Sequence, residues 1–75
     1  MSKGAPVATR EALGLRIKVE RVQRKRAASS VALAAGLDPS HYSRIENGHV
    51  MPQPDTLDKI AETLGVPVST LLRGE

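Results

Sequence analysis

The chain has 75 residues, enough for one small domain, and it contains no cysteine, which excludes disulfide bonds and thiolate metal sites. It has a single Tyr and neither Trp nor Phe, so aliphatic side chains must fill the core, which favours close-packed short helices over an aromatic-rich sheet. Residues 1–26 hold eight Lys/Arg and two Glu, whereas residues 27–75 carry a net negative charge, and this basic end indicates either a polyanion partner or a solvated basic helix.

An N-terminal arm is predicted over residues 1–9, which are small and polar and include Gly4 and Pro6. Lys3 and Arg10 flank this arm. We expect the arm either to have no role or to follow a DNA groove.

A first helix is predicted over residues 10–24, because Leu13 and Ile17 have the spacing that places two apolar side chains on one helix face. Arg21 continues the same stripe. A second helix is predicted over residues 28–35. Either Ser29 caps a shortened version of it, or its beginning is frayed.

A tight turn and a third helix follow over residues 39–46, and this stretch organises the chain. Gly36 ends the preceding helix, since glycine tolerates the positive φ that helix C-termini commonly need. Asp38 is a suitable N-cap and Pro39 fits the first helical position. Tyr42 and Ile45 then point inward, which leaves a polar outer strip formed by Ser40, Ser43 and Arg44.

Two further helices complete the prediction. The helix over residues 54–64 begins at Pro54, has an apolar stripe at helical spacing and ends at Gly65. A last short helix spans residues 68–72 and includes adjacent Leu71 and Leu72, which cannot both face inward. The apolar side chains of this helix either form a two-fold interface or pack within the monomer.

These motifs in register resemble the helix-turn-helix of the lambdoid phage repressor and Cro family, also called the XRE family. The resemblance spans residues 13–72 and rests on LGLRIKVER, ALAAGLDPSHYSRIENG, Pro52, TLDKIAETLGV and the final Leu71-Leu72. It implies an all-α, compact five-helix bundle of the lambda repressor type. The domain is then residues 10–75, with the helix over residues 39–46 in the major groove.

The resemblance also implies site residues. Arg21 is expected to pair with Glu46, which locks the first helix to the third. Arg44 is expected to read guanine or, alternatively, to clamp a phosphate. The further base-contacting candidates are Pro39, Ser40, His41 and Ser43, and the phosphate-contacting candidates are Arg24, Lys25, Arg26, Ser29, Asn47 and His49.

The chain departs from the family pattern in two places. Lys25 and Arg26 stand where the family usually has Gly-Leu, and Ala27 and Ala28 replace a usual polar cap and a glutamine that touches the backbone. The second departure is at residues 50–51, which are apolar where the family frequently has Arg or Lys. We expect the basic run 24–26 to replace these lost contacts by meeting phosphates.

No catalytic, cofactor or metal constellation is found, since His41 and His49 lack a carboxylate at ligand spacing. We therefore expect that the protein is not an enzyme. No apolar run approaches the roughly 20 residues that span a bilayer, so we expect a cytoplasmic protein. The sequence predicts a transcriptional regulator that binds double-stranded DNA as a homodimer on a near-palindromic operator, and we expect it to act as a repressor. Its interface candidates are Val68, Leu71 and Leu72. The alternative is an antitoxin or adaptor that binds a protein partner with the same fold.

Overall fold

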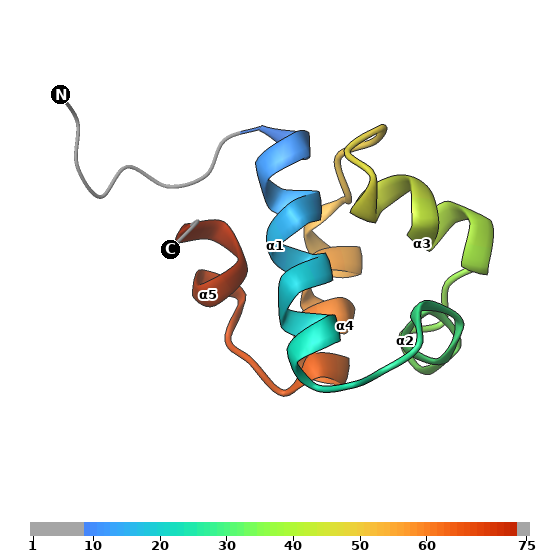
Figure 1. Cartoon of the computed structure of the whole chain (residues 1–75). Helices are drawn as coiled ribbons and strands as arrows, with labels where there is room; N and C mark the ends of the chain where they lie inside the picture. The colour runs from blue at the N-terminus through green and yellow to red at the C-terminus, as the bar shows by residue number, and fades with distance from the viewer. Residues whose placement is uncertain (1–8, 74–75) are drawn as a thin grey trace, which may run out of the picture.

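The computed structural model describes residues 9–73, and they form five helices and no strand. In chain order these are α1 (Arg10–Gln23), α2 (Ala28–Ala34), α3 (Pro39–Glu46), α4 (Pro54–Leu64) and α5 (Val68–Arg73) (Figure 1). The predicted all-α, five-helix architecture is confirmed. The helices α1 and α2 each end one residue earlier than expected, and α5 ends one residue later.

The helices α1 and α4 form the centre of the bundle. Figure 1 shows α5 on one flank of α1, with α2 and α3 on the other flank. The helix α1 packs against α3 and α5, while α4 packs against α2 and α5, and α2 packs against α3. Because both neighbours of α1 lie on opposite flanks, α1 separates the surface of α3 from that of α5.

The core is aliphatic around one aromatic ring. Tyr42 is the largest fully buried side chain, and the other buried residues of the hydrophobic core cluster are Leu, Ile, Val or Ala. Leu71 is completely buried in this core, whereas Leu72 and Val68 are only partly buried against it. The prediction that Leu71 lies in a dimer interface is therefore wrong, because its side chain belongs to the core of the monomer.

Four helices end in the same way. The residues after them, Lys25, Gly36, Gly48 and Gly65, have positive φ angles of 56°, 76°, 78° and 74°. In each case the N–H of the next residue donates to the carbonyl oxygen five residues earlier. This arrangement is the Schellman motif, in which a left-handed residue stops the helix.

The helix beginnings differ from one another. The Thr9 hydroxyl caps α1 by accepting a 3.0 Å hydrogen bond from the Ala12 N–H, so Thr9, at the end of the expected arm, is the N-cap of the helix. The remainder of that arm, residues 1–8, lies outside the described residues. Ala27 occupies the N-cap of α2 and provides no side-chain cap, and Ser29 lies inside the helix. The prediction that Ser29 caps α2 is therefore wrong. No helix within residues 9–73 is long and apolar enough to cross a membrane.

Candidate nucleic-acid interface

The beginning of α3 is held by the carboxylate of Asp38. One carboxylate oxygen accepts hydrogen bonds from the N–H groups of Ser40 (3.0 Å) and His41 (3.3 Å), and the Ser40 hydroxyl donates to the same oxygen. Pro39 follows the cap at the first helical position, where a missing N–H costs nothing. The hydrogen bonds, first that of the Ser40 hydroxyl and then those of the two backbone N–H groups, lower the pKa of Asp38.

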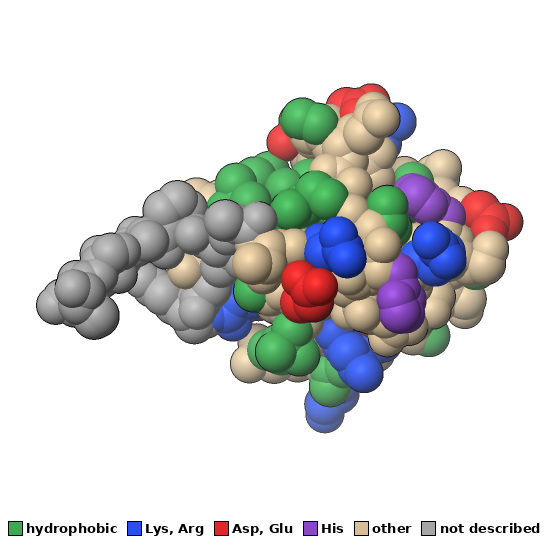
Figure 2. Space-filling model, turned by 90° about the horizontal axis from the view of Figure 1, so that it is seen from above, with side chains coloured by type: hydrophobic (Ala, Val, Ile, Leu, Met, Phe, Trp, Pro, Cys, Tyr) green, Lys and Arg blue, Asp and Glu red, His purple; other side chains and the backbone are tan. Residues whose placement is uncertain are grey.

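The two sides of α3 have different environments. Tyr42, Ile45 and Glu46 are buried, whereas Arg44 is exposed and makes no side-chain hydrogen bond or ion pair with any other residue from 9 to 73. We call the outward side the α3 face, and its exposed residues are Pro39, Ser40, His41, Ser43, Arg44 and Asn47. Figure 2 views the molecule from this end and shows histidine and basic side chains gathered on one part of it.

The inward side of α3 is tied to α1 by the ion pair between Arg21 and Glu46 that the resemblance implies. Arg21 donates from Nε to Glu46 Oε2 (2.6 Å) and from Nη2 to Oε1 (3.1 Å), and it also donates from Nη1 to the Arg26 carbonyl oxygen (2.7 Å). Only 14% and 6% of the two side chains are exposed, so water screens the pair weakly. The hydrogen bond to Glu46 raises the pKa of Arg21.

Gly14 allows the backbones of α1 and α3 to touch. A Cβ atom at this position would lie 2.2 Å from the Ile45 carbonyl oxygen and 2.7 Å from that of Glu46. No side chain fits there, so the distance between the two helices depends on this glycine. The sequence analysis did not single Gly14 out, although an isolated glycine inside a helical pattern is a sign of close approach.

Tyr42 lies beside the Arg21–Glu46 pair. Its hydroxyl is buried and makes no hydrogen bond of ordinary geometry within residues 9–73. Burial, and next the neighbouring Glu46, raise the pKa of Tyr42, so the phenol stays neutral. The side chain therefore serves as apolar packing beneath the α3 face.

The segment after α3 is attached to the first turn of α1. Arg10 Nε donates to the Gly48 carbonyl oxygen at 3.0 Å, and a Cβ atom on Gly48 would lie 2.9 Å from Glu11 Cα. Asn47 and His49, on either side of this buried glycine, are exposed. The Asn47 side chain donates from Nδ2 to Ser43 Oγ (3.3 Å). Of the residues predicted to contact phosphates, Asn47 thus lies on the α3 face and His49 lies next to it. Arg10, which the sequence analysis placed only at the border of the arm, holds the glycine between them.

The basic run after α1 has partners within the chain. Arg24 Nη1 donates to the carbonyl oxygen of Glu20 (2.9 Å) and to its Oε1 (2.7 Å), and Arg26 Nη1 donates to the Thr63 carbonyl oxygen (3.2 Å) at the end of α4. Lys25, by contrast, is exposed in the left-handed conformation. The structure therefore gives Arg24 and Arg26 partners other than the phosphates that we expected. Ser29 is exposed in the first turn of α2.

Within residues 9–73 no group of three or more His, Asp or Glu side chains is placed to hold a metal ion.

The sequence analysis also missed the ion pairs of Glu20, although this residue stands four residues from both Arg16 and Arg24. That spacing on a helix brings opposite charges together.

Comparisons with known proteins agree with this geometry. A family model described as Helix-turn-helix matches residues 17–71. The HTH-type transcriptional repressor RghR of Bacillus subtilis (strain 168) is 35% identical over 63 residues, which are 83% of this chain and 47% of that protein. The chain thus spans about half the length of this curated relative.

Two solved structures have the same arrangement of helices. The clp gene regulator ClgR from Corynebacterium glutamicum superposes with a TM-score of 0.81 at 26% identity, covering 83% of this chain and 66% of that one. The restriction-modification controller protein C.AhdI from Aeromonas hydrophila superposes with a TM-score of 0.81 at 22% identity, covering 83% and 94%, which shows the fold alone. The family model covers most of the chain, and therefore this chain belongs to the XRE-type helix-turn-helix family of DNA-binding transcriptional regulators.

Proposed function

We propose that this chain is a repressor that binds a specific double-stranded DNA sequence with α3 in the major groove. The observation that carries the proposal is the exposed, unpaired guanidinium of Arg44 on a helix whose other side is locked to α1 by Arg21 and Gly14. A recognition helix requires this combination, because base readout needs free donors on a rigid element. The repressor role is supported by the name of the relative RghR.

Arg44 is the principal base reader in this proposal. Its planar fork matches the O6 and N7 acceptors of guanine, and such a bidentate pair contributes roughly 1–3 kcal/mol of discrimination. His41 and Ser43 are shorter readers on the same face. Ser40 contributes less, since its hydroxyl already donates to Asp38.

Asn47 and His49 contact the phosphates on one side of the groove, where Arg10 holds their segment in place. Lys25 is the member of the basic run best placed to add a phosphate contact, because it is exposed and has no side-chain partner within residues 9–73. These contacts orient the domain on the duplex but do not read its sequence.

The proposed assembly is a homodimer in the cytoplasm. One small domain contacts few base pairs, and two copies on half-sites about 34–36 Å apart provide the missing specificity. The interface candidates that remain are Val68 and Leu72, both partly exposed on α5.

Selection of bound sequences from a random duplex pool tests the proposal. We expect an enriched near-palindromic motif with guanine in each half-site, and two chains per duplex by analytical ultracentrifugation. A pool that remains unenriched after repeated rounds would contradict sequence-specific binding.

A protein-interaction module is the second candidate function, and exposed apolar side chains favour it. Leu15 and Val22, 61% and 54% exposed, share the outer side of α1, and Leu33 on α2 is 68% exposed. Replacing Leu15 and Val22 with Gln leaves DNA selection unchanged if the chain acts through DNA alone. The interaction module would be supported instead if the wild type enriches no DNA sequence and a protein that co-purifies with the wild type is lost from the variant.

A further inference from the structure

The side of α1 that faces away from the core carries a second row of apolar side chains. Leu15 and Val22 are more than half exposed, Val19 between them is partly buried, and Ala12 is exposed. We call these four residues the α1 stripe. In Figure 1 no other helix lies in front of α1. A helix with apolar side chains on two opposite sides is typical of one that is covered on both, so the α1 stripe is a candidate contact surface.

The spacing of the α1 stripe favours a helix as the partner. Its members follow one another at intervals of three, four and three residues, which is the pattern of the a and d positions in a heptad repeat. A stripe that contains only these positions is narrow and corresponds to the seam between two paired helices. A lipid surface favours a broader apolar side. The geometry therefore matches one helix laid along α1.

One edge of the α1 stripe is basic. Lys18 lies along this edge between Leu15 and Val22, and Lys25 follows it seven residues later, just beyond the end of α1. Both lysines are exposed and make no side-chain hydrogen bond or ion pair with any other residue from 9 to 73. Glu11, at the beginning of the edge, has its Oε2 3.7 Å from Arg10 Nε. The charges that remain unmatched along this edge are therefore positive.

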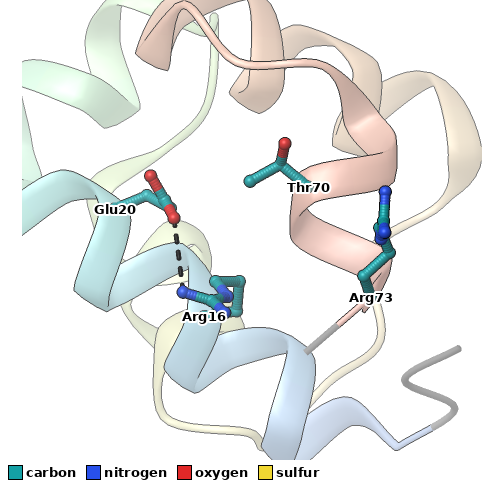
Figure 3. A pocket seen from close by; sticks show the side chains of 4 residues that line it. All are labelled: Arg16, Glu20, Thr70 and Arg73. Atoms are coloured by element: carbon teal, nitrogen blue, oxygen red, sulfur yellow. Dashed lines mark hydrogen bonds and ion pairs between the residues drawn. The ribbon is translucent and has the colours of Figure 1, made fainter. Parts of the chain in front are cut away.

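The other edge of the α1 stripe is formed by Arg16 and Gln23. Arg16 is turned toward α5, and its Nη1 donates to Glu20 Oε2 at 3.3 Å. Figure 3 shows this hydrogen bond beside the pocket that Arg16 and Glu20 line together with two residues of α5. Gln23 is exposed and neutral. This edge thus presents no free carboxylate.

We propose that the α1 stripe binds one amphipathic helix of another protein, a helix with apolar side chains at heptad spacing and Asp or Glu beside them. The apolar side chains cover Leu15, Val19 and Val22, and the acidic ones meet Lys18 and Lys25. In paired helices the flanking charges select the partner and its direction, while the apolar seam provides the affinity.

The same charges disfavour a second copy of this chain as the occupant. Two antiparallel copies with their whole stripes in contact place Lys18 next to Lys18 of the second copy, because this residue is near the middle of the stripe. In a parallel pair each basic edge faces the edge with Arg16 and Gln23, which offers no free acid. Both arrangements leave positive charge unmatched, and such repulsion selects against self-pairing.

This inference names the partner class for the second candidate function and rests on that function. It is compatible with DNA binding, since the α1 stripe shares no residue with the α3 face. Lys25 alone belongs both to the basic edge and to the candidate phosphate contacts. The experiment below uses no DNA, so its failure leaves the result of the DNA selection unaffected.

Fluorescence anisotropy of labelled synthetic peptides, titrated with the whole chain, tests the α1 stripe. The probe is a peptide of about three heptads with Leu at a and d and Glu at e and g, and a matched peptide has Lys in place of Glu. We expect the acidic peptide to bind at least about tenfold more tightly than the basic one. An acidic peptide of the same composition with its Leu residues out of heptad order should also bind at least about tenfold more weakly.

Leu15→Gln together with Val22→Gln should weaken binding of the acidic peptide at least about tenfold, because two apolar contacts are lost. Leu33→Gln is the control, since it removes an exposed apolar side chain from α2, and it should leave the affinity unchanged. Lys18→Glu together with Lys25→Glu should reverse the preference, so that the basic peptide binds more tightly. Circular dichroism should show intact helices in every variant, because all five positions are exposed.

The proposal is overturned if the acidic peptide does not bind, or if the heptad order or the charge of the peptide makes no difference. An undiminished affinity in the Leu15→Gln/Val22→Gln variant also overturns it. Sedimentation equilibrium without peptide and flotation with phosphatidylglycerol vesicles test the other occupants. Self-association or vesicle binding that this variant abolishes would make a second copy or a lipid surface the occupant in place of a partner helix.

Discussion

Arg21 of α1 donates to both carboxylate oxygens of Glu46, the last residue of α3. The same guanidinium holds the Arg26 carbonyl oxygen in the turn that leads to α2. One side chain therefore connects the first helix with both helices of the helix-turn-helix. Its removal leaves a carboxylate buried without its partner, which costs more than the pair itself contributes.

Replacement of Arg21 by Met should lower the free energy of unfolding by about 3–5 kcal/mol. The double variant Arg21→Met/Glu46→Met should recover part of this loss, because no unpaired charge remains. Urea denaturation measures both values. Lys18→Met, at an exposed position of α1, should stay within about 0.5 kcal/mol of the wild type. A single variant as stable as the double would show that the burial of Glu46 is unimportant.

Gly14→Ala should destabilise the domain by about 2 kcal/mol or more, because the new methyl group overlaps the Ile45 carbonyl oxygen. Helix propensity alone favours alanine by about 1 kcal/mol, so the sign of the change identifies the clash. Amide shifts should move throughout α3. Gly36→Ala meets no atom within 4 Å and should lose only about 1–2 kcal/mol, for its positive φ, without moving α3. A stabilised Gly14→Ala variant would refute the close approach.

Lys25→Gly should stabilise the domain by about 0.5–1 kcal/mol. Lys25 occupies the left-handed position that glycine fills after α2, α3 and α4, and this conformation costs a non-glycine residue about 1–2 kcal/mol. Thermal unfolding measures the gain. Lys25→Ala removes the charge but retains the strain, so it should not be stabilised. Equal gains in the two variants would assign the effect to charge rather than to the backbone.

Asp38 should contribute a pH-dependent part of the stability. Its folded pKa lies below the ordinary value of about 3.9, so its contribution is complete above that value and disappears as the pH falls through the folded pKa. Asn can still accept the capping hydrogen bonds but does not titrate. The stability difference between the wild type and Asp38→Asn should therefore shrink as the pH falls below about 4.

Urea midpoints between pH 7 and pH 2.5 provide this measurement. Asp58→Asn is the control, since Asp58 is exposed on α4 and makes no side-chain hydrogen bond within residues 9–73. A difference between the wild type and Asp38→Asn that stays constant down to pH 2.5 would contradict the role of the carboxylate.

Arg44→Ala should weaken binding to the selected duplex by about 1–3 kcal/mol and leave folding stability unchanged, because the side chain has no partner in the domain. Electrophoretic mobility shifts at fixed salt measure the affinity. Lys59→Ala on α4 removes the same charge from an exposed position outside the α3 face. A uniform loss across all duplexes, with no change in preference at guanine positions, would make Arg44 a phosphate clamp.

Much of the fold was predictable because its signals are local. The Asp38 cap and Pro39 begin α3, and glycines stop α2, α3 and α4 through hydrogen bonds that span only five residues. Hydrogen bonds between residues so close in the sequence form without the rest of the chain, and they set where each helix begins and ends. The exposed position of Arg44 also follows, since it is set by the period of one helix.

The sequence by itself thus determined the five helices and the polar side of α3. The tertiary structure alone decided that Leu71 rather than Leu72 enters the core, that Arg26 reaches Thr63, and that Gly14 lies against α3. Each of these contacts joins residues far apart in the chain, and the angles and distances at which the helices pack select the partner. The residue pattern of one helix does not specify the distances between that helix and its neighbours.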